Sequence, residues 1–235
     1  MNIKEDNVRM RCGRSNNSRG EIVRNTAIEV VGLVVYGIGL YLTIQAGIGV
    51  APYDCFYLGI SEVTGIIYGN ISVVMGFIII AIDWALGARI GIGTIVDAIV
   101  VGKTVDLCNY IGLLPEINSV LLGIAIMLAG LVLEGLGQFI YMGSALGCGP
   151  YDGLMVALSK RWPKVSIGMI GVLLNAIAFV LGWLLGGPIG IGTVISVALM
   201  GPIMELVFKI LHFEAEAVAH QDIFESLRVI SKKNI

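Results

Sequence analysis

Long apolar runs dominate the chain and predict membrane-spanning helices. A helix rises about 1.5 Å per residue, so about 20 apolar residues cross the roughly 30 Å hydrocarbon core of a bilayer. Charged residues lie mostly outside such runs: half of them fall within residues 1–26 and 212–235. The pattern predicts an all-α, polytopic membrane protein with six spans. These are residues 27–45, 68–88, 92–112, 119–142, 166–186 and 191–211.

A shorter apolar piece follows the first predicted span, and another follows the fourth. Residues 52–62 read PYDCFYLGISE and residues 150–160 read PYDGLMVALSK. Eleven helical residues reach only about 16 Å, too short to cross a bilayer. Each piece begins with proline and has aspartate in its first turn, as helix starts often do. We predict two re-entrant half-helices; a short interfacial helix or a thin full span are the alternatives.

The chain resembles itself at a fixed spacing, which predicts two homologous halves. Residues 32–54 and 130–152 are identical at nine of 23 positions at an offset of 98. At an offset of 99, Gly-Ile-Gly-Thr at 91–94 recurs at 190–193. Small residues two helical turns apart predict close packing of the first span of each half. They are Gly32, Gly39, Gly130 and Gly137.

Positive charge predicts the orientation. Six lysines and arginines precede the first span, which places the N-terminus in the cytoplasm. Three spans and a half-helix per half give inverted repeats, whereas four spans per half give parallel repeats. We favour the inverted form, because it leaves every remaining basic residue outside the spans on the cytoplasmic side, whereas the parallel form moves Arg89 outside. The predicted parts are a basic tail (1–26), repeat 1 (27–112), a linker (113–118), repeat 2 (119–211) and an amphipathic cytoplasmic tail (212–235).

Composition narrows the classes of function. Hydrophobic residues make up 57% of the chain and charged residues 14%, which argues against a soluble domain or a nucleic-acid-binding protein. Four scattered cysteines give no zinc or disulfide pattern. The Gly-Ile-Gly-Thr motifs lack a following Gly-Lys, so they predict turns with threonine caps rather than a phosphate loop. We expect no enzyme activity, no catalytic residue, no metal and no cofactor. The expected partner is the lipid bilayer.

The motifs also carry a family resemblance. Gly-x-Ala-Pro-Tyr-Asp at 49–54, its repeat Gly-Cys-Gly-Pro-Tyr-Asp at 147–152, and the block from Asp83 to Thr94 resemble the YczE/YitT-type family of bacterial multi-spanning membrane proteins. The resemblance covers about residues 27–211. It implies an integral protein of the bacterial cytoplasmic membrane. The family is poorly characterised, so the resemblance supplies no substrate and no functional residues.

The two Pro-Tyr-Asp motifs are the first candidate site. A half-helix that starts inside a membrane directs unpaired N–H groups and partial positive charge at whatever precedes it, and transporters use such ends to hold substrates or ions. Asp54 and Asp152 coordinate a cation or carry a proton in this interpretation, or cap their helices in the simpler one. Tyr53 and Tyr151 are ligand contacts or interfacial anchors.

Charged and amide side chains within spans form a second group. Ionisable groups in a bilayer are costly and usually face the protein interior. Lys103 and Asp106 share a helix face, as do Glu134 and Gln138. Asn175 lies near the centre of its span. Asp83, Asp106 and Glu205 lie near span ends, where a side chain can also reach the membrane surface.

These features favour a secondary transporter of a small solute or ion, with its site at the two helix breaks. The alternative is a membrane scaffold or regulatory protein that does not transport. Both are compatible with a homo-oligomer. The sequence specifies neither the substrate nor the coupling ion.

Overall fold

A computed structural model describes residues 19–88, 90–115, 117–144, 146–147 and 149–211. Over these residues the chain is all-helical. The predicted tail at 212–235 and most of the tail at 1–26 lie outside the described residues. The helices are α2 (Arg19–Gln45), α3 (Pro52–Thr64), α4 (Tyr68–Ala85), α5 (Ile92–Ile111), α6 (Val120–Met142), α7 (Pro150–Arg161), α8 (Ile167–Leu184) and α9 (Ile191–Ile210).

Each predicted span corresponds to one helix, with two differences. Helix α2 starts at Arg19 rather than near residue 27, because Arg, Glu and Asn are compatible with helix on the polar side of the boundary. Five helices in the described part are long and apolar enough to cross a membrane: α2, α4, α6, α8 and α9. Helix α5 has the length, but it contains Asp97, Lys103 and Asp106.

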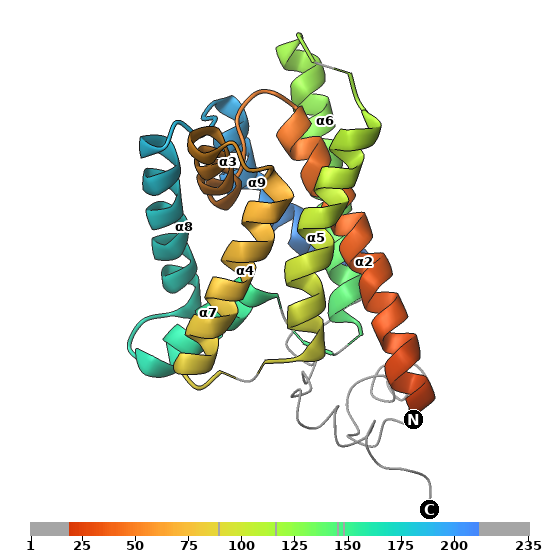
Figure 1. The fold of residues 1–235 in the computed structure, drawn as a ribbon, viewed down its shortest axis with the longest axis vertical. Helices are drawn as coiled ribbons and strands as arrows, with labels where there is room; N and C mark the ends of the chain where they lie inside the picture. The colour runs from red at the N-terminus through yellow and green to blue at the C-terminus, as the bar shows by residue number, and fades with distance from the viewer. Residues whose placement is uncertain (1–18, 89, 116, 145, 148, 212–235) are drawn as a thin grey trace, which may run out of the picture.

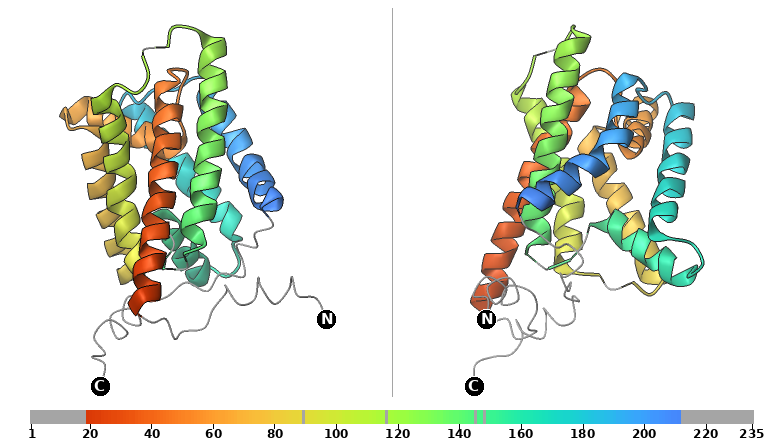
Figure 2. Two further views of the ribbon diagram at one scale, coloured as in Figure 1. Left: turned by 90° about the vertical axis from the view of Figure 1, so that its right-hand side faces the viewer. Right: turned by 180° about the vertical axis from the view of Figure 1, so that it is seen from behind.

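The long helices run alternately along the molecule. Figures 1 and 2 show α2, α5 and α8 rising from the end where α2 begins, while α4, α6 and the oblique α9 run the other way. The short α3 lies toward the end where α2 finishes, and α7 lies toward the end where α2 begins. Helices α2, α4 and α5 therefore run opposite to α6, α8 and α9, respectively.

Helices α2 and α6 cross through glycines. A Cβ atom added at Gly39 would lie 2.7 Å from the carbonyl oxygen of Gly130, and one at Gly130 would lie 2.7 Å from the carbonyl oxygen of Gly39. Gly32 and Gly137 face each other in the same way, with 2.7 Å between an added Gly137 Cβ and the Gly32 carbonyl oxygen. The two backbones touch directly, as the small residues of the sequence predict.

The short helices pack on the opposite half of the chain. Helix α3 packs on α8, and α7 packs on α4. A Cβ atom at Gly182 of α8 would lie 2.6 Å from the carbonyl carbon of Cys55, which shows how closely α3 and α8 approach. The loops before the short helices are tied across as well: Gly192 N–H donates to the Ile48 carbonyl (2.7 Å). In the counterpart bond, Gly93 N–H donates to the Leu146 carbonyl (3.3 Å).

The Gly-Ile-Gly-Thr motifs open α5 and α9. Thr94 Oγ1 accepts a hydrogen bond from the Gly91 N–H (3.4 Å), and Thr193 Oγ1 accepts one from the Gly190 N–H (3.3 Å). Both threonines therefore cap their helices, as predicted. Glycine is required at 190 because an added Cβ would collide with the Ile48 carbonyl oxygen of the loop before α3.

Candidate functional site

The two Pro-Tyr-Asp motifs meet through their tyrosines. The rings of Tyr53 and Tyr151 pack edge-to-face with centroids 4.5 Å apart, although 98 residues separate them. Each tyrosine is the second residue of its short helix, so the contact fixes the start of α3 against the start of α7. The aromatic contacts continue from Tyr53 to Tyr57 and from Tyr57 to Tyr68, each at 6.1 Å between centroids.

Asp54 is buried beside this aromatic row. Its Oδ1 accepts a hydrogen bond of 2.7 Å from the hydroxyl of Tyr68, at the start of α4. The N-cap of α3, Ala51, has no capping side chain. Asp54 lies in the first turn, where the helix dipole favours negative charge. Its position therefore fits both interpretations, a charge that complements the dipole and a group available to a ligand.

Asp152 lies in the equivalent turn of α7 and has an acidic neighbour. A Cβ atom added at Gly149 would lie 2.6 Å from Oδ2 of Asp97 and 3.9 Å from Oδ2 of Asp152, so both carboxylates lie beside that glycine. Their negative charges repel each other. Bringing two carboxylates together is costly unless a proton or a cation is shared between them.

Glu134, on α6, is a further buried carboxylate. It accepts a hydrogen bond of 3.2 Å from Thr43 Oγ1 of α2. Gln138, one turn later, is also buried. The buried and neighbouring carboxylates come from four helices: Asp54 from α3, Asp97 from α5, Glu134 from α6 and Asp152 from α7.

Asn175 joins the site through Tyr151. Its amide nitrogen donates to the Tyr151 hydroxyl (2.8 Å) and to the Gly171 carbonyl (3.0 Å). The Tyr151 hydroxyl itself donates to the same carbonyl at 3.2 Å. Asn175 thus fixes the orientation of one of the two meeting rings.

Lys103 and Asp106 belong to a different cluster. Their side chains form an ion pair (3.5 Å), and Lys103 also donates to the Asn70 amide oxygen. Asp106 Oδ1 accepts the backbone N–H of Gly69 (2.8 Å) and so caps the start of α4. The expectation that Lys103 faces the protein interior, as ionisable groups within spans usually do, is wrong: its side chain is 48% exposed.

The sequence reasoning missed one buried acidic residue, Glu29, and misjudged the position of another, Asp83. Glu29 of α2 is almost fully buried, and its Oε2 atom has no hydrogen-bond partner among the described residues. Asp83 of α4 is 2% exposed and has an equally unpartnered Oδ1, so it does not reach the membrane surface. The signal for Glu29 was available in the sequence, because it is an acidic residue inside the first predicted span.

The chemistry of the arrangement is acidic and aromatic. Within the described residues, no lysine, arginine or histidine forms an ion pair with Asp54, Asp97, Glu134 or Asp152. No group of three or more potential ligands in the same part of the chain is close enough to hold a metal ion. Carboxylates without basic partners are neutralised by protons or by a bound cation, and tyrosine faces attract organic cations.

Comparison with known proteins places the chain in a family. The chain is 30% identical over 191 residues to the uncharacterized membrane protein YczE of Bacillus subtilis, covering 78% of this chain and 85% of YczE. It is 31% identical over 188 residues to the uncharacterized protein YyaS of the same organism, covering 78% and 92%. An uncharacterized protein of Haemophilus influenzae is 29% identical over 188 residues, covering 80% and 85%.

No solved structure matches the chain. A family model matches residues 23–209, which include every helix that contributes to the Tyr53–Tyr151 site. Together with the apolar helices, these matches identify a membrane protein of the YczE type. The chain belongs to the family of unknown function DUF6198.

Proposed function

We propose that the chain is a secondary transporter of a small cationic solute or an inorganic cation, with its site at the Tyr53–Tyr151 contact. That contact is the observation that carries the proposal, because it brings two interrupted segments from different halves to one place. Discontinuous helices that meet in this way form the substrate sites of several transporter folds.

The charge of the site supports a cation over an anion. Asp54 and Glu134 are buried, the carboxylates of Asp97 and Asp152 both lie beside Gly149, and the four residues come from four different helices. Ionisable groups held inside a membrane protein usually mark ion or proton pathways, because burial of an unused charge is costly. The same carboxylates bind protons when no substrate is bound, so the proton is the coupling ion of the proposed transport.

Binding measured in detergent, followed by uptake into liposomes, tests the proposal on the purified protein. A thermal-shift screen in detergent with alkali cations, primary amines and quaternary ammonium compounds comes first, and hits are followed by uptake of the labelled compound. We expect stabilisation by at least one cation, with weaker binding at lower pH, because protons compete for the carboxylates. A chain that binds no cation and takes up none is a scaffold or regulator instead.

The proposal includes inverted repeats of three spans and one half-helix, with both termini in the cytoplasm. The opposite directions of corresponding helices support the inversion. So does the exchange of partners, in which α3 packs on α8 and α7 packs on α4. The contact of Gly32 with Gly137 maps onto that of Gly130 with Gly39 when the halves are exchanged.

Side-specific labelling tests this topology. Residue 65 follows α3 and residue 160 lies in the last turn of α7, and the two helices lie toward opposite ends of the molecule. Single cysteines at these positions, in a background without native cysteines, are expected to react with an impermeant maleimide from opposite sides of the membrane. Reaction from one side only contradicts the inverted arrangement and favours four spans per half.

A further inference from the structure

The first half of the chain is closed by a glycine contact between α4 and α5. A Cβ atom added at Gly102 would lie 2.8 Å from the carbonyl oxygen of Gly69 and 3.2 Å from its Cα atom. The carboxylate of Asp106 adds the hydrogen bond to the Gly69 N–H. Tyr68 and Val105, which flank the contact, are buried in one apolar cluster.

The equivalent contact in the second half is open. Gly168 and Gly201 stand at the positions of Gly69 and Gly102 at the offset of 99. Among the described residues, no atom lies within 4 Å of a Cβ atom added at either. Over the same residues, α8 and α9 make at most marginal contact.

Exposure of the flanking residues shows the same asymmetry. Ile167, the counterpart of the buried Tyr68, is 48% exposed. Val197, the counterpart of the buried Ala98, is 64% exposed. Two surfaces that match a tightly packed pair in the first half are therefore unpacked in the second.

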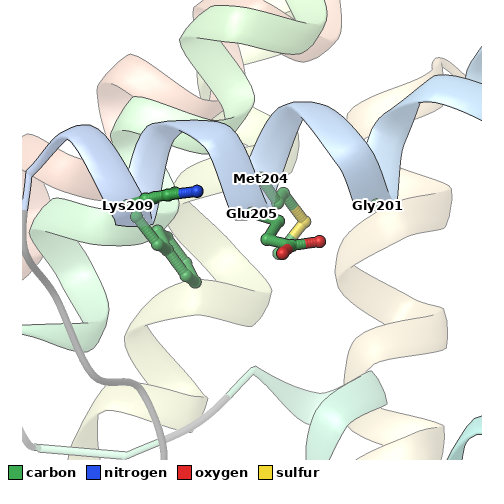
Figure 3. Close-up of a pocket in the computed structure, with 5 residues that line it drawn as sticks. Gly201, Met204, Glu205 and Lys209 are labelled. Atoms are coloured by element: carbon green, nitrogen blue, oxygen red, sulfur yellow. The ribbon is translucent and has the colours of Figure 1, made fainter.

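A shallow, largely open hollow lies along this face of α9. Gly201, Met204, Glu205, Phe208 and Lys209 line it. Figure 3 shows the side chains of Met204, Glu205 and Lys209 directed from α9 into that space. Glu205 stands at the position of Asp106, the residue that caps α4. Pro202 follows Gly201 inside α9 and removes a backbone donor, which makes this helix easier to bend there.

We propose that the chain has a second conformation, in which Gly168 contacts Gly201, Glu205 caps α8, and the contact between Gly69 and Gly102 opens. In this second conformation the second half takes the packing that the first half has now, and the first half takes that of the second. The hollow along α9 is then filled by α8, and an equivalent hollow opens along α5. The inference rests on the proposed inverted repeats, and it supplies the alternating access that the proposed transport needs.

Cysteine labelling in liposomes tests this exchange without measuring transport. The parent carries no native cysteines and receives either Val105→Cys, buried now, or Met204→Cys, which lines the hollow. A water-soluble maleimide is expected to label Met204→Cys quickly and Val105→Cys slowly. Gly201→Leu blocks closure of α9 onto α8, so it is expected to slow labelling at Val105→Cys about tenfold or more.

Further variants separate exchange from misfolding. Gly168→Leu wedges the same contact from α8 and is expected to act like Gly201→Leu, with an unchanged melting temperature for both. Asp106→Asn weakens the present closure and is expected to speed labelling at Val105→Cys, whereas Glu205→Gln is expected to slow it. Labelling at Val105→Cys that is equally slow in the parent and in both leucine variants overturns the proposal. That result leaves the transport proposal to its own uptake test.

Discussion

Replacement of Gly137 by leucine is expected to prevent stable folding. A Cβ atom at this position would collide with the backbone nitrogen of Tyr36 and lie 2.7 Å from the Gly32 carbonyl oxygen. Overpacking of a core costs about 1–3 kcal/mol where side chains can adjust, and here the obstacle is backbone. That is a large part of the roughly 5–15 kcal/mol that stabilises an ordinary fold. We expect aggregated protein in fluorescence-detected size-exclusion chromatography.

The control is the same substitution at a glycine with free space. Gly168→Leu also adds a leucine to a long apolar helix, but an added Cβ meets no atom within 4 Å among the described residues. It is expected to elute as a single peak with the melting temperature of the parent. Equal behaviour of the two variants contradicts the direct backbone contact between α2 and α6.

The double variant Asp54→Asn, Asp152→Asn is expected to abolish cation uptake while the protein still folds. Asparagine keeps the size of the side chain but removes the carboxylate from the first turn of each short helix. Loss of one charged hydrogen bond weakens binding by about tenfold to a hundredfold, and two losses compound this. Uptake into liposomes, together with binding measured by thermal shift, gives the effect on transport and on affinity separately.

Glu62→Gln provides a matched control for these substitutions. Glu62 lies on the same short helix as Asp54 but is exposed near its end. Its uptake is expected to equal that of the parent, since no charge at the Tyr53–Tyr151 contact changes. A double variant that folds and transports at the full rate shows that the two aspartates only cap their helices.

Helix positions and breaks follow closely from the sequence, because they depend on local properties. Apolar length predicts the long helices, and the Pro-Tyr-Asp pattern predicts both short ones to within two residues at their ends. The glycines of the first span of each half correctly indicate close packing. The pattern does not reveal that Gly39 and Gly130 are each other's partners, because periodicity identifies a face and not what covers it.

The site itself is less predictable. Tyr53 and Tyr151 were selected separately, but their contact depends on how α3 docks on α8 and α7 on α4. Helical spacing correctly pairs Lys103 with Asp106. It does not predict that Asp106 caps α4, because that bond joins helices 37 residues apart in sequence. Side-chain depth along a span therefore predicts burial poorly when the neighbouring helix is unknown.

The crossed packing of the short helices sets the earliest point in synthesis at which each of them can reach its partner. Helix α3 finds its main neighbour, α8, only after another hundred or so residues have been synthesised. Until then the glycine face of α2 also lacks α6. When only the first half has been synthesised, α2 and α3 therefore lie in the bilayer without their main packing partners.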